Sequence, residues 1–117
     1  MSHFSTLRTK LTDAEILKAS LCDLGFSIKT DADVRGSNSQ RVRADLVAVL
    51  AGDYDLGWSR DDRGSFSIVG DLWGVAKKHN IAALMNAINQ KYAVKKTLAQ
   101  VKQPGLQNAS VKLVLQS

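Results

Sequence analysis

The chain has 117 residues, 44% of them hydrophobic, and 16 Lys and Arg against 11 Asp and Glu give it a formal net charge of +5. This length predicts a single domain over residues 1–117 with enough buried surface for one core. No apolar run approaches the roughly 20 residues of a membrane-spanning helix. The start lacks the apolar core of a signal peptide, and the single cysteine excludes an internal disulfide. We therefore expect a cytoplasmic protein.

The positive charge permits weak attraction to nucleic acid, to an acidic protein, or to anionic lipid in a peripheral membrane association. However, the basic residues are dispersed and acidic residues lie among them. The one local cluster consists of Lys91, Lys95, Lys96 and Lys102. A lysine-rich, solvated helix face explains that cluster without any partner.

The first third of the chain begins with an alternating pattern that predicts a strand over residues 3–10. Thr12 is predicted to cap a helix over residues 13–24, because Glu15 three positions later completes a capping box. Gly25 suits the position after the last helical turn. This amphipathic helix has clear start and stop signals.

The next segment is predicted to contain two strands separated by a loop. A short strand is expected at residues 26–29. The run 30–40 is rich in Asp, Ser, Gly and Asn, so we interpret it as a loop with a short extended piece around Val34. Alternation returns over residues 41–50, whose last part is apolar on both faces, as in a strand that passes through the centre of a sheet.

The chain is organised around a predicted β-hairpin that contains an alternating aromatic face. Tyr54, Leu56 and Trp58 alternate with polar residues and glycine in the first strand. The polar run 60–64 suits a hairpin loop, and alternation resumes from Phe66. Trp58 is therefore predicted to anchor the core.

The last third is predicted to contain a second helix that Asn80 caps. Its apolar stripe shifts after Tyr92, which predicts a kink or a second short helix near Ala93. A final strand is expected where apolar residues alternate over 111–115. Together these elements predict an α+β fold: an antiparallel sheet of about five to six strands with two to three helices packed on one face.

Metal binding has little support from the sequence. His3, His79 and Cys22 are the soft ligands, and none of them pairs with another at a ligand spacing. Cys22 follows Leu21 on the predicted helix, close to its apolar stripe, so we interpret it as a buried structural thiol. No metal and no cofactor are expected.

Catalysis has only weak candidates. Asp45, Asp55 and Asp71 lie on or at the ends of predicted strands, and a shared face would raise the pKa of one of them by charge repulsion. The simpler interpretation is that each caps a turn or points to solvent. No glycine-rich nucleotide-binding motif and no nucleophile-elbow motif is present. We therefore expect a protein that is not an enzyme.

The polar segment from Val34 to Arg43 is the best candidate for a partner-binding site, and a flexible connector without a partner is the alternative interpretation. Arg35, Arg41 and Arg43 lie at its ends, and the planar guanidinium group suits bidentate contacts with carboxylate or phosphate. A protein partner is the first hypothesis. An RNA- or DNA-binding module is the alternative, but the aromatic residues alternate as core residues do and so are not free for stacking.

A set of short motifs occurs in a fixed order over nearly the whole chain. The motifs are Ser2-His3-Phe4, Val34-Arg35-Gly36, Ala44-Asp45-Leu46-Val47, Tyr54-Asp55-Leu56-Gly57-Trp58, Asp71-Leu72 and Asn89-Gln90-Lys91-Tyr92-Ala93. In this order they resemble the conserved plastid and cyanobacterial open-reading-frame family ycf thirty-five, a domain-of-unknown-function family.

The resemblance implies a small accessory protein of cyanobacteria, plastids or their viruses, in the cytoplasm or the stroma. It implies no enzymatic activity. For photosynthetic members it implies support of photosystem I accumulation through protein–protein binding. For bacterial members it implies a further alternative, an adaptor of an AAA-type ATPase.

Overall fold

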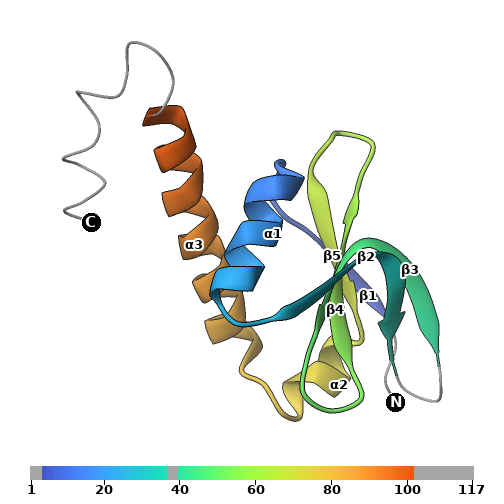
Figure 1. Cartoon of the computed structure of the whole chain (residues 1–117). Coiled ribbons are helices and arrows are strands. Elements are labelled where there is room, and N and C mark those ends of the chain that lie inside the picture. The colour runs from blue at the N-terminus through green and yellow to red at the C-terminus, as the bar shows by residue number, and fades with distance from the viewer. Residues whose placement is uncertain (1–3, 37–39, 102–117) are drawn as a thin grey trace.

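The computed structural model describes residues 4–36 and 40–101, which form a five-stranded antiparallel sheet and three helices (Figure 1). The elements are β1 (Ser5–Arg8), α1 (Ala14–Asp23), β2 (Ser27–Arg35), β3 (Arg41–Val49), β4 (Asp55–Arg60), β5 (Phe66–Gly70), α2 (Leu72–Ala76) and α3 (Ile81–Val101). The strand order is β1-β5-β4-β3-β2. The α+β class is confirmed, and the strand predicted over 111–115 lies outside the described residues.

The main core lies between the helices and one face of the sheet. Trp58 is at its centre, paired with Leu46 on β3 and with Ile68 on β5, and it has no exposed surface. Leu17 and Leu21 of α1 pack into the same cluster. The prediction that Trp58 anchors the core is confirmed, because the alternation of β4 places it on the helix-covered face.

The start of α1 differs from the prediction. The cap is Asp13, whose Oδ1 accepts a hydrogen bond from the Ile16 backbone N–H at 3.1 Å. The backbone N–H groups of Thr12 and Asp13 donate to the Tyr92 hydroxyl at 3.1 and 2.9 Å. Burial opposes ionisation of this hydroxyl, but the hydrogen bonds from Thr12 and Asp13 and the charge of Lys96 outweigh it and lower the pKa of Tyr92. Tyr92 thus joins α3 to the start of α1.

Helix α3 is one continuous helix, so one of the two predicted alternatives, a second short helix near Ala93, was wrong. Asn80 caps α3 as predicted, since its Oδ1 accepts the Ala83 N–H at 3.0 Å. The apolar stripe breaks at Lys95 because its ammonium group reaches across to Asp23 of α1, at an Nζ–Oδ2 distance of 2.6 Å. That hydrogen bond lowers the pKa of Asp23. The flexible lysine stem keeps the charge at the surface while the helix continues.

A short helix that the sequence analysis missed, α2, lies between the hairpin and α3. Asp71 caps it by accepting the Gly74 N–H at 3.0 Å. Gly74 is required because the Tyr54 ring packs directly on its Cα, and an added Cβ would collide with that ring. Trp73 on the outer side of α2 is 58% exposed.

Candidate protein-binding surface

The predicted loop over residues 30–40 is mostly strand. β2 continues to Arg35, and the far halves of β2 and β3 form a hairpin arm, which we define as residues 31–35 and 41–45. The extended piece predicted around Val34 belongs to β2, but the loop predicted at residues 30–33 was wrong because the many polar residues outweighed their alternation with apolar ones. In the arm, Ala32 pairs with Ala44 and Val34 pairs with Val42, which gives it a small apolar face.

The arm turns over the sheet face that the helices leave open. The ladder breaks between the Thr30–Leu46 and Ala32–Ala44 pairs, where Asp31 has a left-handed φ of 48°. Beyond this bend, Val34 and Ala44 pack with Val47 in a second core, separate from the one under the helices. The partly buried Phe4 and Ala32 pack against it.

Gly57 makes this approach of the arm to the sheet possible. A Cβ at Gly57 would lie 2.8 Å from Ala44 Cβ and would collide with Val34. Gly57 pairs with Val47 and Val69, so it lies at the centre of the sheet below the arm. Glycine in a strand interior often marks such a close approach.

An ion pair between the buried Asp55 and the partly exposed Arg35 fixes the end of the arm. Arg35 donates from Nε to Asp55 Oδ2 and from Nη2 to Asp55 Oδ1, both at 2.9 Å. The backbone N–H of Arg35 and that of Leu50 donate to the same carboxylate at 3.1 and 3.4 Å. The hydrogen bond to Asp55, opposed by burial, raises the pKa of Arg35. The Asp55 side chain is only 3% exposed, so its charge is neutralised inside the protein.

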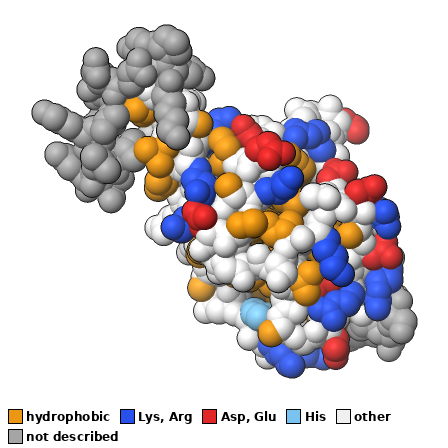
Figure 2. Space-filling view, viewed as in Figure 1, with side chains coloured by type: hydrophobic (Ala, Val, Ile, Leu, Met, Phe, Trp, Pro, Cys, Tyr) orange, Lys and Arg blue, Asp and Glu red, His pale blue; other side chains and the backbone are white. Residues whose placement is uncertain are grey.

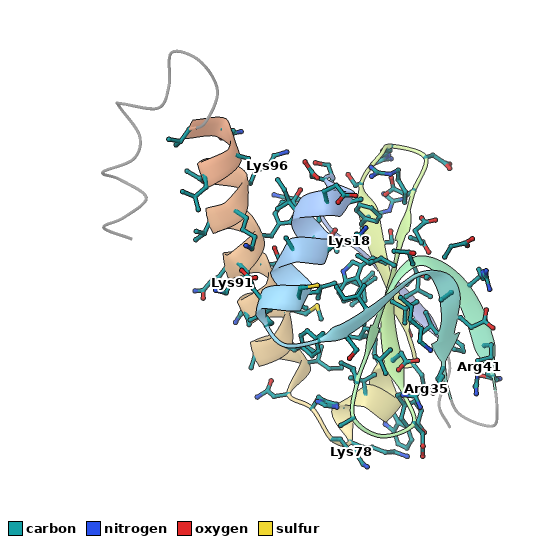
Figure 3. The ribbon with its side chains drawn as sticks, viewed as in Figure 1. Lys18, Arg35, Arg41, Lys78, Lys91 and Lys96 are labelled. Carbon is teal, nitrogen blue, oxygen red and sulfur yellow. The ribbon has the colours of Figure 1, made fainter. Side chains whose placement is uncertain are left out.

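The structure therefore separates the three predicted arginines. Arg35 is bound to Asp55, whereas Arg41 and Arg43 are exposed. Among the described residues, the Arg41 side chain donates only to the carbonyl of Gln40, at 2.8 Å. Arg43 lies 3.3 Å from Asp31 and 3.5 Å from Asp33, and hydrogen bonding to Asp31 raises its pKa. Figure 3 shows Arg35 and Arg41 at the same end of the arm.

The three strand aspartates each have their own structural partner. Asp45 accepts the Arg60 backbone N–H at 2.8 Å, Asp55 binds Arg35, and Asp71 caps α2. Over residues 4–36 and 40–101, no three His, Cys, Asp or Glu side chains gather closely enough to hold a metal ion. The simpler interpretation of the aspartates, as capping and outward-facing residues, fits Asp45 and Asp71 but missed the buried role of Asp55.

Two further observations concern the single cysteine, Cys22, and the possibility of a membrane span. Cys22 is exposed, so the prediction of a buried thiol was wrong; it lies one position beyond the buried Leu21 on α1 and faces solvent. In the described part of the chain, no helix has the length and apolar character needed to cross a membrane.

An exposed aromatic residue, Trp73, was not predicted from the sequence. The Lys77 ammonium group lies 4.3 Å from the ring centroid of Trp73 on α2, and Trp73 is exposed. The hairpin pattern suggested that the aromatic residues were internal, but Trp73 lies beyond the strand, after the cap of a helix that was not predicted. The Asp71 cap and the spacing to Gly74 were the only signals for it.

The site is thus an exposed arginine-bearing arm, held by a second core and the ion pair between Arg35 and Asp55 on an α+β domain. The chain belongs to the family described as "Protein of unknown function (DUF1257)", whose model matches residues 20–113. It is 30% identical over 127 residues to "Uncharacterized protein ycf35" of Guillardia theta, covering 99% of this chain and 97% of that protein. It is 25% identical over 126 residues to the protein of the same name from Pyropia yezoensis, with the same coverage. These matches confirm the ycf35 resemblance, and no solved structure matches the chain.

Proposed function

We propose that this protein is a non-enzymatic accessory protein that binds a protein partner through the outer surface of the arm. The observation that carries the proposal is the ion pair between Arg35 and Asp55, which fixes a hairpin whose other two arginines remain exposed. A preorganised surface loses little conformational freedom on binding, which favours affinity. Arginine is also enriched among the residues that dominate binding energy at protein interfaces.

The charge pattern of the arm favours a protein over nucleic acid. Asp31 and Asp33 lie beside Arg43, and basic and acidic side chains are interspersed over the part of the molecule that holds the arm (Figure 2). A phosphate backbone would meet repulsion from these carboxylates nearly as often as attraction from the arginines. A protein surface with alternating charges is complementary to such a pattern.

The family supports a cellular setting for this function. The relatives named ycf35 from Guillardia theta and Pyropia yezoensis, and the resemblance of the sequence to the plastid and cyanobacterial family, support a role beside photosynthetic complexes, on the stromal or cytoplasmic side. Support of photosystem I accumulation is the specific role we propose. Binding to an AAA-type ATPase would use the same surface with a different partner.

The test compares capture of proteins from a photosynthetic lysate by the wild-type chain and by a double variant, Arg41→Ala/Arg43→Ala. Arg35 is left in place because its loss would disturb the fold. We expect capture to fall by about tenfold or more, since a single arginine at an interface hot spot contributes about 2 kcal/mol or more. The matched control is Arg63→Ala/Lys91→Ala, which removes the same charge from exposed positions away from the arm.

Two results would contradict the proposal. One is equal capture by the wild type and the arm variant, with both folded by circular dichroism. The other is capture that nuclease treatment abolishes, together with binding of a labelled oligonucleotide that is tighter than the non-specific range of about 10⁻⁴–10⁻⁶ M and falls steeply with salt. The second result would favour a nucleic-acid module.

A further inference from the structure

An apolar groove of about 660 Å³ lies between β1 and α3, on the opposite edge of the sheet from β2. Its apolar lining includes Leu7, Leu11, Ile68, Met85 and Tyr92. Leu7 is 47% exposed, which is unusual for a leucine whose strand neighbour, Ile68, is 5% exposed. Exposed apolar grooves are among the surface features that mark interaction sites.

The groove is bordered by an open strand edge. β1 is the end strand of the sheet, and it pairs with β5 on one side only within the described chain. All four of its residues are exposed. An edge strand beside an apolar groove offers main-chain hydrogen bonds and side-chain contacts to one further strand.

The segment that follows α3 has the pattern that such a site requires. In Val111-Lys112-Leu113-Val114-Leu115, the residues at 111, 113 and 115 are all apolar, so a strand here would have one fully apolar face. The family model extends to residue 113, so most of this segment belongs to the shared domain. Residues 106–117 contain no acidic side chain, so apolar burial would drive docking more than charge would.

The direction and reach of the chain also fit. Tyr92 and Lys96 of α3 contact the start of α1, just past the end of β1, so α3 runs toward the same end of the sheet as β1. A chain that turns back after Val101 would therefore run antiparallel to β1. The nine residues 102–110 span up to about 30 Å when extended and include Pro104-Gly105, a pair typical of turns. The continuation of α3 past Lys96 adds only about 8 Å to be retraced.

We propose that residues 111–115 pair with β1 as a sixth strand, antiparallel to it, with Val111, Leu113 and Leu115 filling the groove. The occupant is the chain's own tail because attachment to α3 raises its local concentration to the millimolar range, about that of other segments on short flexible linkers. A free peptide from another protein lacks this advantage. Docking of the tail also closes the exposed edge of the sheet against pairing with other chains.

The test is amide hydrogen exchange on the full chain, on Leu113→Asp and on Lys112→Asp. Leu113 faces the groove in the proposed strand and Lys112 faces away, so the two variants place the same new carboxylate on opposite faces. For the wild type and for Lys112→Asp, we expect protection of about tenfold or more at amides of β1 and of residues 111–115. For Leu113→Asp, we expect that protection to be lost at both segments while β4 and β5 stay protected.

Unprotected amides at 111–115 in the wild-type chain would overturn the proposal. Equal loss of protection in the two variants would also overturn it, because Leu113 faces the groove in the proposed strand and Lys112 does not. A tail that exchanges freely while an added peptide from another protein protects β1 would assign the groove to a partner instead.

Discussion

Replacing Arg35 by Ala should lower the free energy of unfolding by roughly 3–5 kcal/mol, because it leaves the Asp55 carboxylate buried without its counter-ion. Asp55 has a side chain only 3% exposed, and its two remaining donors are backbone N–H groups of the arm and of Leu50. Urea denaturation followed by circular dichroism measures the change. The loss of stability should include the arm, because the ion pair fixes the end of the arm to the main sheet.

The matched control for this prediction is Arg41→Ala, in which an exposed arginine of the same arm is removed. Surface substitutions of this kind usually change the free energy of unfolding by less than about 0.5 kcal/mol. Similar denaturation midpoints for the two variants would contradict the role assigned to the ion pair. That result would also mean that Arg35 is available to bind a partner.

Replacing Trp58 by Ala should cost roughly 3–5 kcal/mol of the free energy of unfolding, because it opens a large cavity at the centre of the main core. Trp58 has no exposed surface and packs between Leu46 and Ile68 on neighbouring strands. Its indole N–H has no hydrogen-bond partner in the described chain, so the cost arises from lost apolar packing. Chemical denaturation of the purified variant measures it.

The other tryptophan provides the control. Trp73→Ala removes the same side chain from a position that is 58% exposed, and its expected effect on the free energy of unfolding is below about 0.5 kcal/mol. The indole fluorescence of the Trp73→Ala variant should show the buried Trp58 alone and shift to longer wavelength on unfolding. An unchanged denaturation midpoint for Trp58→Ala would contradict the account of the core.

The main sheet could be predicted from the sequence because its signals are local. The alternation around Trp58 and the polar run before Phe66 define the central hairpin, and Asn80 marks the start of α3. The prediction at α1 failed by one position because Thr12 and Asp13 are both good capping residues, and the choice between them depends on Tyr92, which is distant in the sequence. The local propensities of Thr12 and Asp13 carry no information about a contact with such a distant residue.

The candidate site was harder to predict because it depends on long-range pairing. Nothing in the local sequence around Arg35 shows that its charge is neutralised by Asp55, twenty positions later, once the arm has turned over Gly57. The long-range pairing of the arm also explains why residues 31–35 form a strand although their polar composition predicted a loop. Arg41 and Arg43 are exposed, but nothing in the sequence distinguishes them from Arg35, and their separation required the three-dimensional contacts.

The most direct test of the arm as a protein-binding surface is site-specific photo-crosslinking. A photoreactive phenylalanine analogue is placed at position 40, an exposed position beside Arg41 that leaves both exposed arginines in place, or at position 63 in the loop between β4 and β5. Each protein is irradiated in a photosynthetic lysate with and without nuclease. We expect a crosslinked protein product from position 40 that nuclease does not remove, and none from position 63. Equal products from both positions, or adducts at position 40 with nucleic acid alone, would contradict a protein-binding role for the arm.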